Sequence, residues 1–225
     1  MRHLHVLCEG QTEEIIARDV LDSHFSGEDV HVTRSILTTK RPAGGPSFKG
    51  GVTSWLKLER ELRRLLHDSS TTALTTLLDY YAFPADAPGM ADRPYGSPHD
   101  RVRHVESALA EKINDKRFVP HLVLHEIETW VLVGCQCLGE VMGDPGPAAD
   151  LERIVQYESG PELVNDGVDT APSKRIMSAY PQYVKTIDGP LVIAEVGLDA
   201  IRSTCPHADG WLRELEVRMS RSVTE

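Results

Sequence analysis

The sequence lacks an excess of positive charge. Its 24 lysines and arginines are opposed by 34 aspartates and glutamates, which gives a formal net charge of −10. This balance argues against a protein whose whole surface attracts nucleic acid. It leaves room for a local basic groove, so a polyanionic partner would have to be met by a local cluster of cations.

The sequence also lacks paired cysteines and a long apolar run at its start. The four cysteines (Cys8, Cys135, Cys137 and Cys205) form no C-x-x-C pair, and Cys135 and Cys137 are better read as core thiols than as a zinc site. The opening residues, MRHLHVLCEG, are not the apolar stretch that a signal peptide or membrane anchor needs. We therefore expect a cytoplasmic protein with reduced thiols that makes no membrane contact.

What is present is the composition of an ordinary globular protein. The chain has 225 residues, of which 40% are hydrophobic and 26% are charged, and it contains no internal repeat. We expect a single domain over residues 1–225. Its core should comprise about residues 1–135, and a helical C-terminal part should comprise about residues 145–220.

The hydrophobic pattern alternates between strands and helices. Short apolar runs predict strands at 3–9, 30–39, 72–79 and 118–125. Amphipathic stretches between them predict helices at 12–24, with Thr12 as N-cap, at 54–68 and at 99–115. Parallel strands need such crossovers, so the pattern predicts an α/β, Rossmann-like fold with a mainly parallel sheet flanked by helices.

Acidic residues follow three of the predicted strands. Glu9 follows the first, Asp79 ends the third, and Glu126 and Glu128 follow the fourth. Ligands of parallel sheets collect beyond the carboxyl ends of the strands, and carboxylates brought together there repel unless a cation neutralises them. Mg²⁺ or Mn²⁺ would serve, and would point to phosphoryl chemistry. Taken singly, each acid could instead simply open a loop or a helix.

Cationic and titratable residues elsewhere suggest supporting roles. In "APSKRI", Lys174 and Arg175 at a helix start would form a phosphate-binding corner, or else lie on a solvated surface. His125, beside Glu126, is either a general acid or base or an ordinary core histidine. We expect the turn-rich segment 84–98 and the loop 40–51, with its cations Lys40, Arg41 and Lys49, to lie near the carboxylates.

Four motifs resemble a known family. "CEGQTEE", "LLDYYAFP", "HEIETWVL" and "APSKRI" occur in order, and the chain from about residue 3 to 215 resembles the bacterial Toprim-like group called domain of unknown function 4276. That group is related to Toprim nucleases of the overcoming-lysogenization-defect type. The resemblance implies a Toprim fold, catalytic and metal-binding roles for Glu9 and Asp79, and Mg²⁺-dependent cutting or transfer at the phosphodiester bonds of a nucleic acid, with the choice between DNA and RNA left open.

The resemblance also implies partners and shows one departure. Such nucleases often act in phage defence with an ATPase, which would be a separate protein because the chain has no G-x-x-x-x-G-K-[ST] motif. The usual Asp-x-Asp is here Asp79-Tyr80-Tyr81, so Glu126 or Glu128 would have to replace the second acid. Two function classes remain: a metal-dependent nuclease, and a non-catalytic interaction module with a degenerate site. A weaker third is a phosphatase-like or nucleotide-processing enzyme.

Overall fold

The computed structural model describes residues 1–25, 29–37, 52, 54–165 and 167–220. The cationic residues Lys40, Arg41 and Lys49 lie outside the described residues, so their expected place near the carboxylates stays a prediction.

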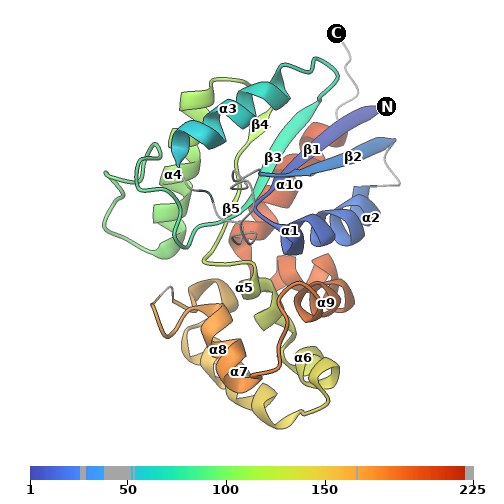
Figure 1. Ribbon diagram of the computed structural model, residues 1–225, viewed down its shortest axis with the longest axis vertical. Helices are drawn as coiled ribbons and strands as arrows, with labels where there is room; N and C mark the ends of the chain where they lie inside the picture. Colours follow the sequence, from blue (N-terminus) through green and yellow to red (C-terminus); the bar gives the residue numbers. More distant parts are fainter. Residues whose placement is uncertain (26–28, 38–51, 53, 166, 221–225) are drawn as a thin grey trace, which may run out of the picture.

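The centre of the molecule is a parallel sheet (Figure 1). Its order is β2-β1-β3-β4, with β5 also pairing with β3, and every recorded pairing is parallel. The predicted mainly parallel sheet flanked by helices is therefore confirmed. The last predicted strand is divided into two short pieces. The strands are β1 (Arg2–Cys8), β2 (Val30–Ile36), β3 (Ala73–Asp79), β4 (Phe118–Val119) and β5 (Leu122–Val123).

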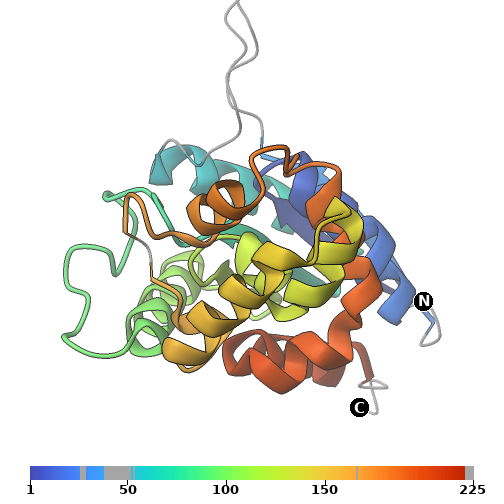
Figure 2. The same ribbon diagram turned by 90° about the horizontal axis from the view of Figure 1, so that it is seen from below.

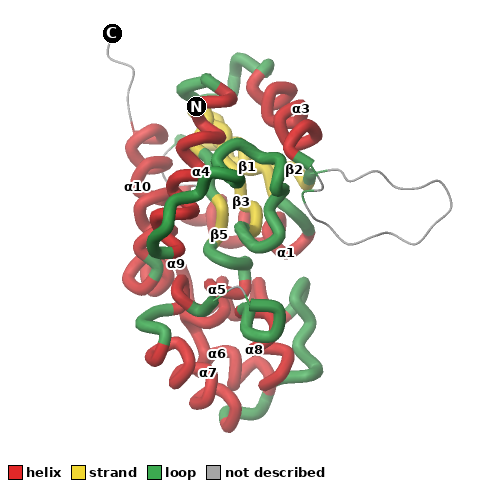
Figure 3. The backbone as a smooth tube through the Cα atoms, turned by 90° about the vertical axis from the view of Figure 1, so that its left-hand side faces the viewer, coloured by secondary structure: helices red, strands yellow, loops and turns green. Residues whose placement is uncertain are grey.

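Alternation along the buried strands separates two hydrophobic cores. Successive strand residues point to opposite faces, so Leu77 packs into one core while its neighbour Leu78 packs into the other. Helices α3 (Trp55–Leu66) and α4 (Pro98–Ile113) cover the face of Leu78, and their inward residues include Leu58 and Val105. Figure 3 shows the strands enclosed between helices, with α3 and α10 on opposite sides.

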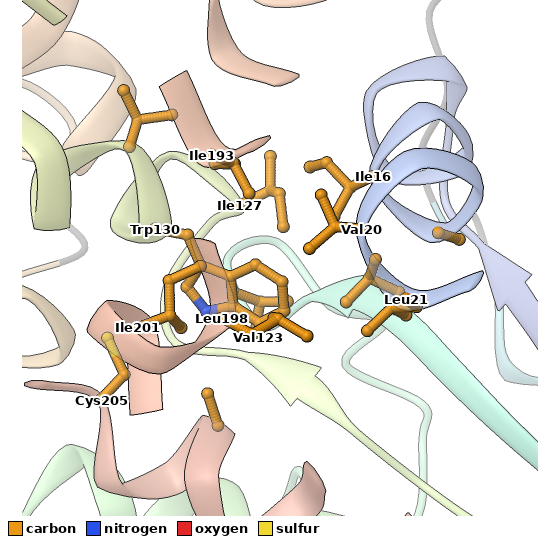
Figure 4. Close-up of a cluster of buried hydrophobic side chains, with 14 of the residues drawn as sticks. Ile16, Val20, Leu21, Val123, Ile127, Trp130, Ile193, Leu198, Ile201 and Cys205 are labelled. Atoms are coloured by element: carbon orange, nitrogen blue, oxygen red, sulfur yellow. The ribbon is translucent and has the colours of Figure 1, made fainter. Parts of the chain in front are cut away.

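The other face is covered by the first helical segment and by the end of the chain. The first segment consists of α1 (Gln11–Ile16), a π-helical stretch (Ala17–Leu21) and α2 (Asp22–Phe25). The last two helices, α9 (Asp188–Thr204) and α10 (Pro206–Ser220), share this core with it. Figure 4 shows Ile16 and Val20 of the first segment facing Ile193 of α9 and Trp130. The C-terminal helices thus complete the core of the sheet.

The N-cap of the first helix lies two residues earlier than the sequence predicts. Gly10, in an extended conformation, is its N-cap, and the expected cap Thr12 lies inside the helix. The Glu13 carboxylate accepts a hydrogen bond of 2.8 Å from the Gly10 N–H, which closes the first turn. This single contact accompanies an N-cap at Gly10 in place of Thr12.

Smaller helices form a layer below the sheet in Figure 1, and Figure 2 shows it from below in yellow and orange. Its buried residues, such as Leu138 and Ile176, belong to the same hydrophobic core as Leu77 of the sheet. As expected, the C-terminal part of the chain is helical. Among the described residues, no helix combines the length and apolar character needed to cross a bilayer. The elements of this layer are α5 (Glu128–Val131), a 3-10 turn (Leu132–Gly134), α6 (Cys135–Met142), α7 (Gly146–Tyr157), a second 3-10 turn (Pro161–Leu163) and α8 (Pro172–Ala179).

Candidate functional site

Glu9 and Asp79 meet at the carboxyl edge of the sheet. β1 ends at Cys8 and β3 at Asp79, and these two strands are parallel neighbours, so both acids emerge at the same edge. The backbone N–H of Asp79 donates a hydrogen bond of 2.9 Å to Oε2 of Glu9. The structure therefore brings together the two residues that the sequence placed at the centre of the site.

The acids that follow β5 join the same edge. The N–H of Ile127 donates to Oδ1 of Asp79 at 2.9 Å, which holds the Asp79 carboxylate against the start of α5. The flanking Glu126 accepts a hydrogen bond of 2.9 Å from the N–H of Ser173, and Glu128 is 1% exposed. Backbone donors thus orient Asp79 and Glu126.

Two further residues complete the group, which we call the acidic edge: Glu9, Glu13, Asp79, Glu126, Glu128 and Lys185. Glu13 sits in the first turn of α1, where the charge of Glu9 raises its pKa and its own charge raises the pKa of Asp79. Lys185 lies between α8 and α9, with its Nζ 3.1 Å from Oε1 of Glu128. Sequence reasoning missed Lys185, because it belongs to no motif and only the folded chain brings it to Glu128.

The acidic edge raises the proton affinity of its own members. Burial, followed by the charges of Glu9 and Glu13, raises the pKa of Asp79 well above its ordinary value. Burial also raises the pKa of Glu9, although the hydrogen bond from Asp79 opposes the shift. The pKa values of Glu13 and Glu128 are each raised to about 7, mainly by burial. At pH values between the ordinary and the raised pKa, each of these carboxyl groups therefore keeps a proton that the same group would release in water.

Lys185 partly compensates for this crowding. Burial alone would lower its pKa, but the negative charges of Glu128 and Glu126 outweigh burial and raise it. One ammonium group stands against five carboxyl groups, so the acidic edge keeps an excess of negative charge when its acids are ionised.

The donor set fits a hard divalent cation. Carboxylate oxygens are the ligands that Mg²⁺ prefers, and Mg²⁺ commonly binds one or two of them directly while keeping several waters. Within the described residues, the acidic edge does not gather three donor atoms within 4.8 Å of one another. Glu9 and Asp79 each also use an oxygen to accept a backbone N–H. Direct binding through one or two carboxylates is the mode that this arrangement allows.

At the start of α8, where the sequence predicted a phosphate-binding corner, Ser173 and Arg175 contact other groups of the protein. The N–H of Ser173, near the start of α8, points at Glu126. Arg175 donates through Nε to the carbonyl of Thr170 at 2.8 Å and lies 3.6 Å from Glu158, while Lys174 is exposed. The start of α8 therefore borders the acidic edge, but the recorded contacts of Arg175 are made with neighbours in its own region.

The His125 side chain is buried, at 2% exposure, beside Glu126. Its carbonyl oxygen accepts a hydrogen bond of 2.7 Å from the N–H of Tyr81. Tyr81 occupies the position of the missing second aspartate, so this bond ties the chain after Asp79 to the strand that leads to Glu126.

Stabilisation by Mg²⁺ is expected to increase with pH. Glu13 and Glu128 have a folded pKa of about 7 against an ordinary value of 4.5, so the folded protein holds more protons than the unfolded chain between these values. Without metal, these groups stabilise the fold fully below pH 4.5, and the contribution is lost as pH rises to about 7. A Mg²⁺ ion bound at the acidic edge would have to displace these protons, so its binding would strengthen over the same pH range.

Thermal unfolding with and without millimolar Mg²⁺ checks this expectation. The rise in melting temperature caused by Mg²⁺ should be small near about pH 5 and larger near about pH 8. Because the melting temperatures with and without Mg²⁺ are compared at the same pH, groups that do not contact the metal affect both values equally. A rise that is equal at both pH values would show that Mg²⁺ does not compete with these protons.

Comparison with known proteins identifies a family and no individual relative. A family model described as domain of unknown function (DUF4276) matches residues 8–216, which includes every member of the acidic edge. No curated protein and no solved structure matches the chain.

Proposed function

Because this chain belongs to the DUF4276 family, whose description leaves its function open, we propose from the acidic edge itself that the protein is a Mg²⁺-dependent nuclease of the Toprim type. The observation that carries the proposal is the meeting of Glu9 and Asp79 at one sheet edge, with Glu126 and Glu128 joining them. Supporting it, ligand sites of open parallel sheets lie beyond the carboxyl ends of the strands.

Each residue of the acidic edge has a role in this reaction. Bound Mg²⁺ or Mn²⁺ would stabilise the negative charge that develops on the phosphodiester during attack by water. Asp79 and Glu9 would hold the ion, with Glu126 or Glu128 replacing the absent second aspartate. Glu9 is also the candidate general base, because burial raises the pKa of its carboxyl group and so makes its carboxylate a stronger base toward water.

Besides pairing with Glu128, Lys185 has a second proposed role, which is to attract the phosphate of the substrate. Its side chain is 41% exposed although its Nζ lies 3.1 Å from Oε1 of Glu128, whose side chain is 1% exposed, so Lys185 connects the solvent with the buried carboxyl groups of the acidic edge. In the proposed reaction, Lys185 would offer the substrate phosphate a positive charge within an otherwise acidic site. With a formal net charge of −10 for the whole chain, local cations of this kind are what a nucleic acid requires.

The biological setting follows from the same assignment. A Toprim nuclease of this class would act on nucleic acid in phage defence together with a separate ATPase. No observation on the described residues identifies either partner, so both belong to the proposal. DNA is the first substrate to test.

A cleavage assay tests the activity. The purified chain is incubated with supercoiled DNA, linear DNA and RNA in Mg²⁺, in Mn²⁺ and in excess chelator. Cleavage that needs either ion and stops with chelator supports the nuclease. If no substrate is cut with either ion, the chain alone is not a nuclease, and an interaction module with a degenerate site becomes the better account.

A further inference from the structure

A second cluster of side chains that could bind a metal ion shares no residue with the acidic edge. It consists of Glu106 on α4, His121 between β4 and β5, and His207 on α10. One donor atom from each of these residues lies within 4.8 Å of the other two. The cluster therefore offers two imidazoles and one carboxylate, from three separate segments of the chain. This donor set differs from the carboxylates at the ends of β1 and β3.

The donor atoms converge on the Glu106 carboxylate. Nε2 of His207 lies 2.9 Å from Oε2 of Glu106, and Nδ1 of His121 lies 3.7 Å from Oε1. The N–H of Leu122 donates to the same Oε1 at 2.8 Å, which orients the carboxylate. One nitrogen of each ring therefore faces the same pair of oxygens.

Surrounding contacts hold the two imidazoles in place. The ring of His121 stacks on Trp211 at 4.2 Å between centroids and on His207 at 4.8 Å. Glu162 accepts the N–H groups of His207 and Ala208, which fixes the start of α10. Such support is what a metal site needs to keep its ligands oriented before the ion arrives.

A plain ion pair explains only part of this cluster. A protonated His207 beside Glu106 accounts for their 2.9 Å contact. It does not account for His121, which is 1% exposed and has no hydrogen-bond partner for either ring nitrogen. A buried imidazole that aims an unpartnered nitrogen at a carboxylate is the arrangement that a metal ion would satisfy.

We propose that Glu106, His121 and His207 bind a zinc-type ion that ties α10 and α4 to the edge of the sheet. Imidazole nitrogens with one carboxylate are ligands that suit Zn²⁺, with bonds of about 2.0–2.2 Å. Because the three donor atoms lie within 4.8 Å of one another, small rotations of the side chains would bring all three within bonding distance of one ion. Three protein ligands leave the fourth position of a tetrahedral zinc ion to water. The ion would tie the elements together, because His121 and His207 are both buried and the ligands come from segments far apart in the chain.

Zinc content and stability test the proposal together. The full chain is stripped with chelator, given Zn²⁺ in the presence of millimolar Mg²⁺ to keep the acidic edge occupied, desalted and analysed for metal. The expected result is about one zinc per chain and a higher melting temperature. Glu106→Gln keeps the shape of the side chain and an oxygen that can accept the Leu122 N–H, and it should weaken zinc binding at least about tenfold.

Two further variants make the result specific. His207→Gln should lose zinc as Glu106→Gln does. His31→Gln, at an exposed histidine that stacks on His3 in the strands β1 and β2, should bind zinc like the unmodified protein. The proposal is overturned if the unmodified chain retains no zinc, or if His31→Gln loses the zinc while Glu106→Gln keeps it. Neither result depends on nuclease activity.

Discussion

Replacing Glu9 with glutamine is expected to reduce metal-dependent cleavage at least about a hundredfold, because in the proposed nuclease it removes a charge that would hold the metal and the group that would accept the proton of water. Glutamine keeps the length of the side chain and an oxygen that can still accept the Asp79 N–H. Asp79→Asn should behave in the same way, since its amide oxygen can still accept the Ile127 N–H. Initial rates of DNA cleavage in Mg²⁺ and Mn²⁺ are the measurement.

The same variants should fold at least as well as the unmodified protein. Each removes a carboxyl group whose burial and acidic neighbours disfavour its charge, so the melting temperature without metal should stay level or rise at about pH 8. Glu111→Gln is a matched control, because this glutamate is exposed on α4. Full cleavage by both Glu9→Gln and Asp79→Asn would remove the catalytic role of the acidic edge.

Replacing Trp211 with alanine is expected to lower the free energy of unfolding by about 3–5 kcal/mol, the usual cost of removing a large buried aromatic side chain. Trp211 is 5% exposed, and its Nε1 donates a buried hydrogen bond of 2.8 Å to Oγ1 of Thr75 in β3. It therefore anchors α10 directly to the central sheet. Denaturant unfolding measures the change.

Two further variants separate the contributions of Trp211. Trp211→Phe keeps an aromatic ring against His121 but loses the hydrogen bond to Thr75, so its cost should be smaller than that of alanine. Leu56→Ala, at a residue 54% exposed on α3, should change stability by less than about 0.5 kcal/mol. A Trp211→Ala protein as stable as the unmodified chain would show that α10 is not part of the sheet's core.

Local patterns in the sequence predicted much of the fold. Buried strands such as β1 and β3 have short apolar runs, and the amphipathic spacing of Leu58 and Leu62 in α3 marks a helix with one buried face. Acids at the ends of those strands could be placed together because parallel neighbours finish at a common edge. The fourth strand was less regular than its pattern suggested, and only short pieces of it pair with β3.

Long-range contacts were beyond the sequence argument. Lys185 reaches Glu128 from the segment between α8 and α9, and nothing in its own neighbourhood marks it as part of a site. His207 and His121 likewise meet only because α10 returns to the sheet, where Trp211 stacks on His121. Spacing rules find ligands that are close in sequence, whereas these pairs depend on how distant elements pack.

The most direct test of the central claim is diffraction from crystals soaked in Mn²⁺, with data collected to reveal anomalous scattering. If the acidic edge is a metal centre, an anomalous peak should lie beside the carboxylates of Glu9 and Asp79, and it should disappear in Asp79→Asn crystals. A peak confined to Glu106, His121 and His207, or no peak at Glu9 and Asp79 at millimolar Mn²⁺, would contradict the claim.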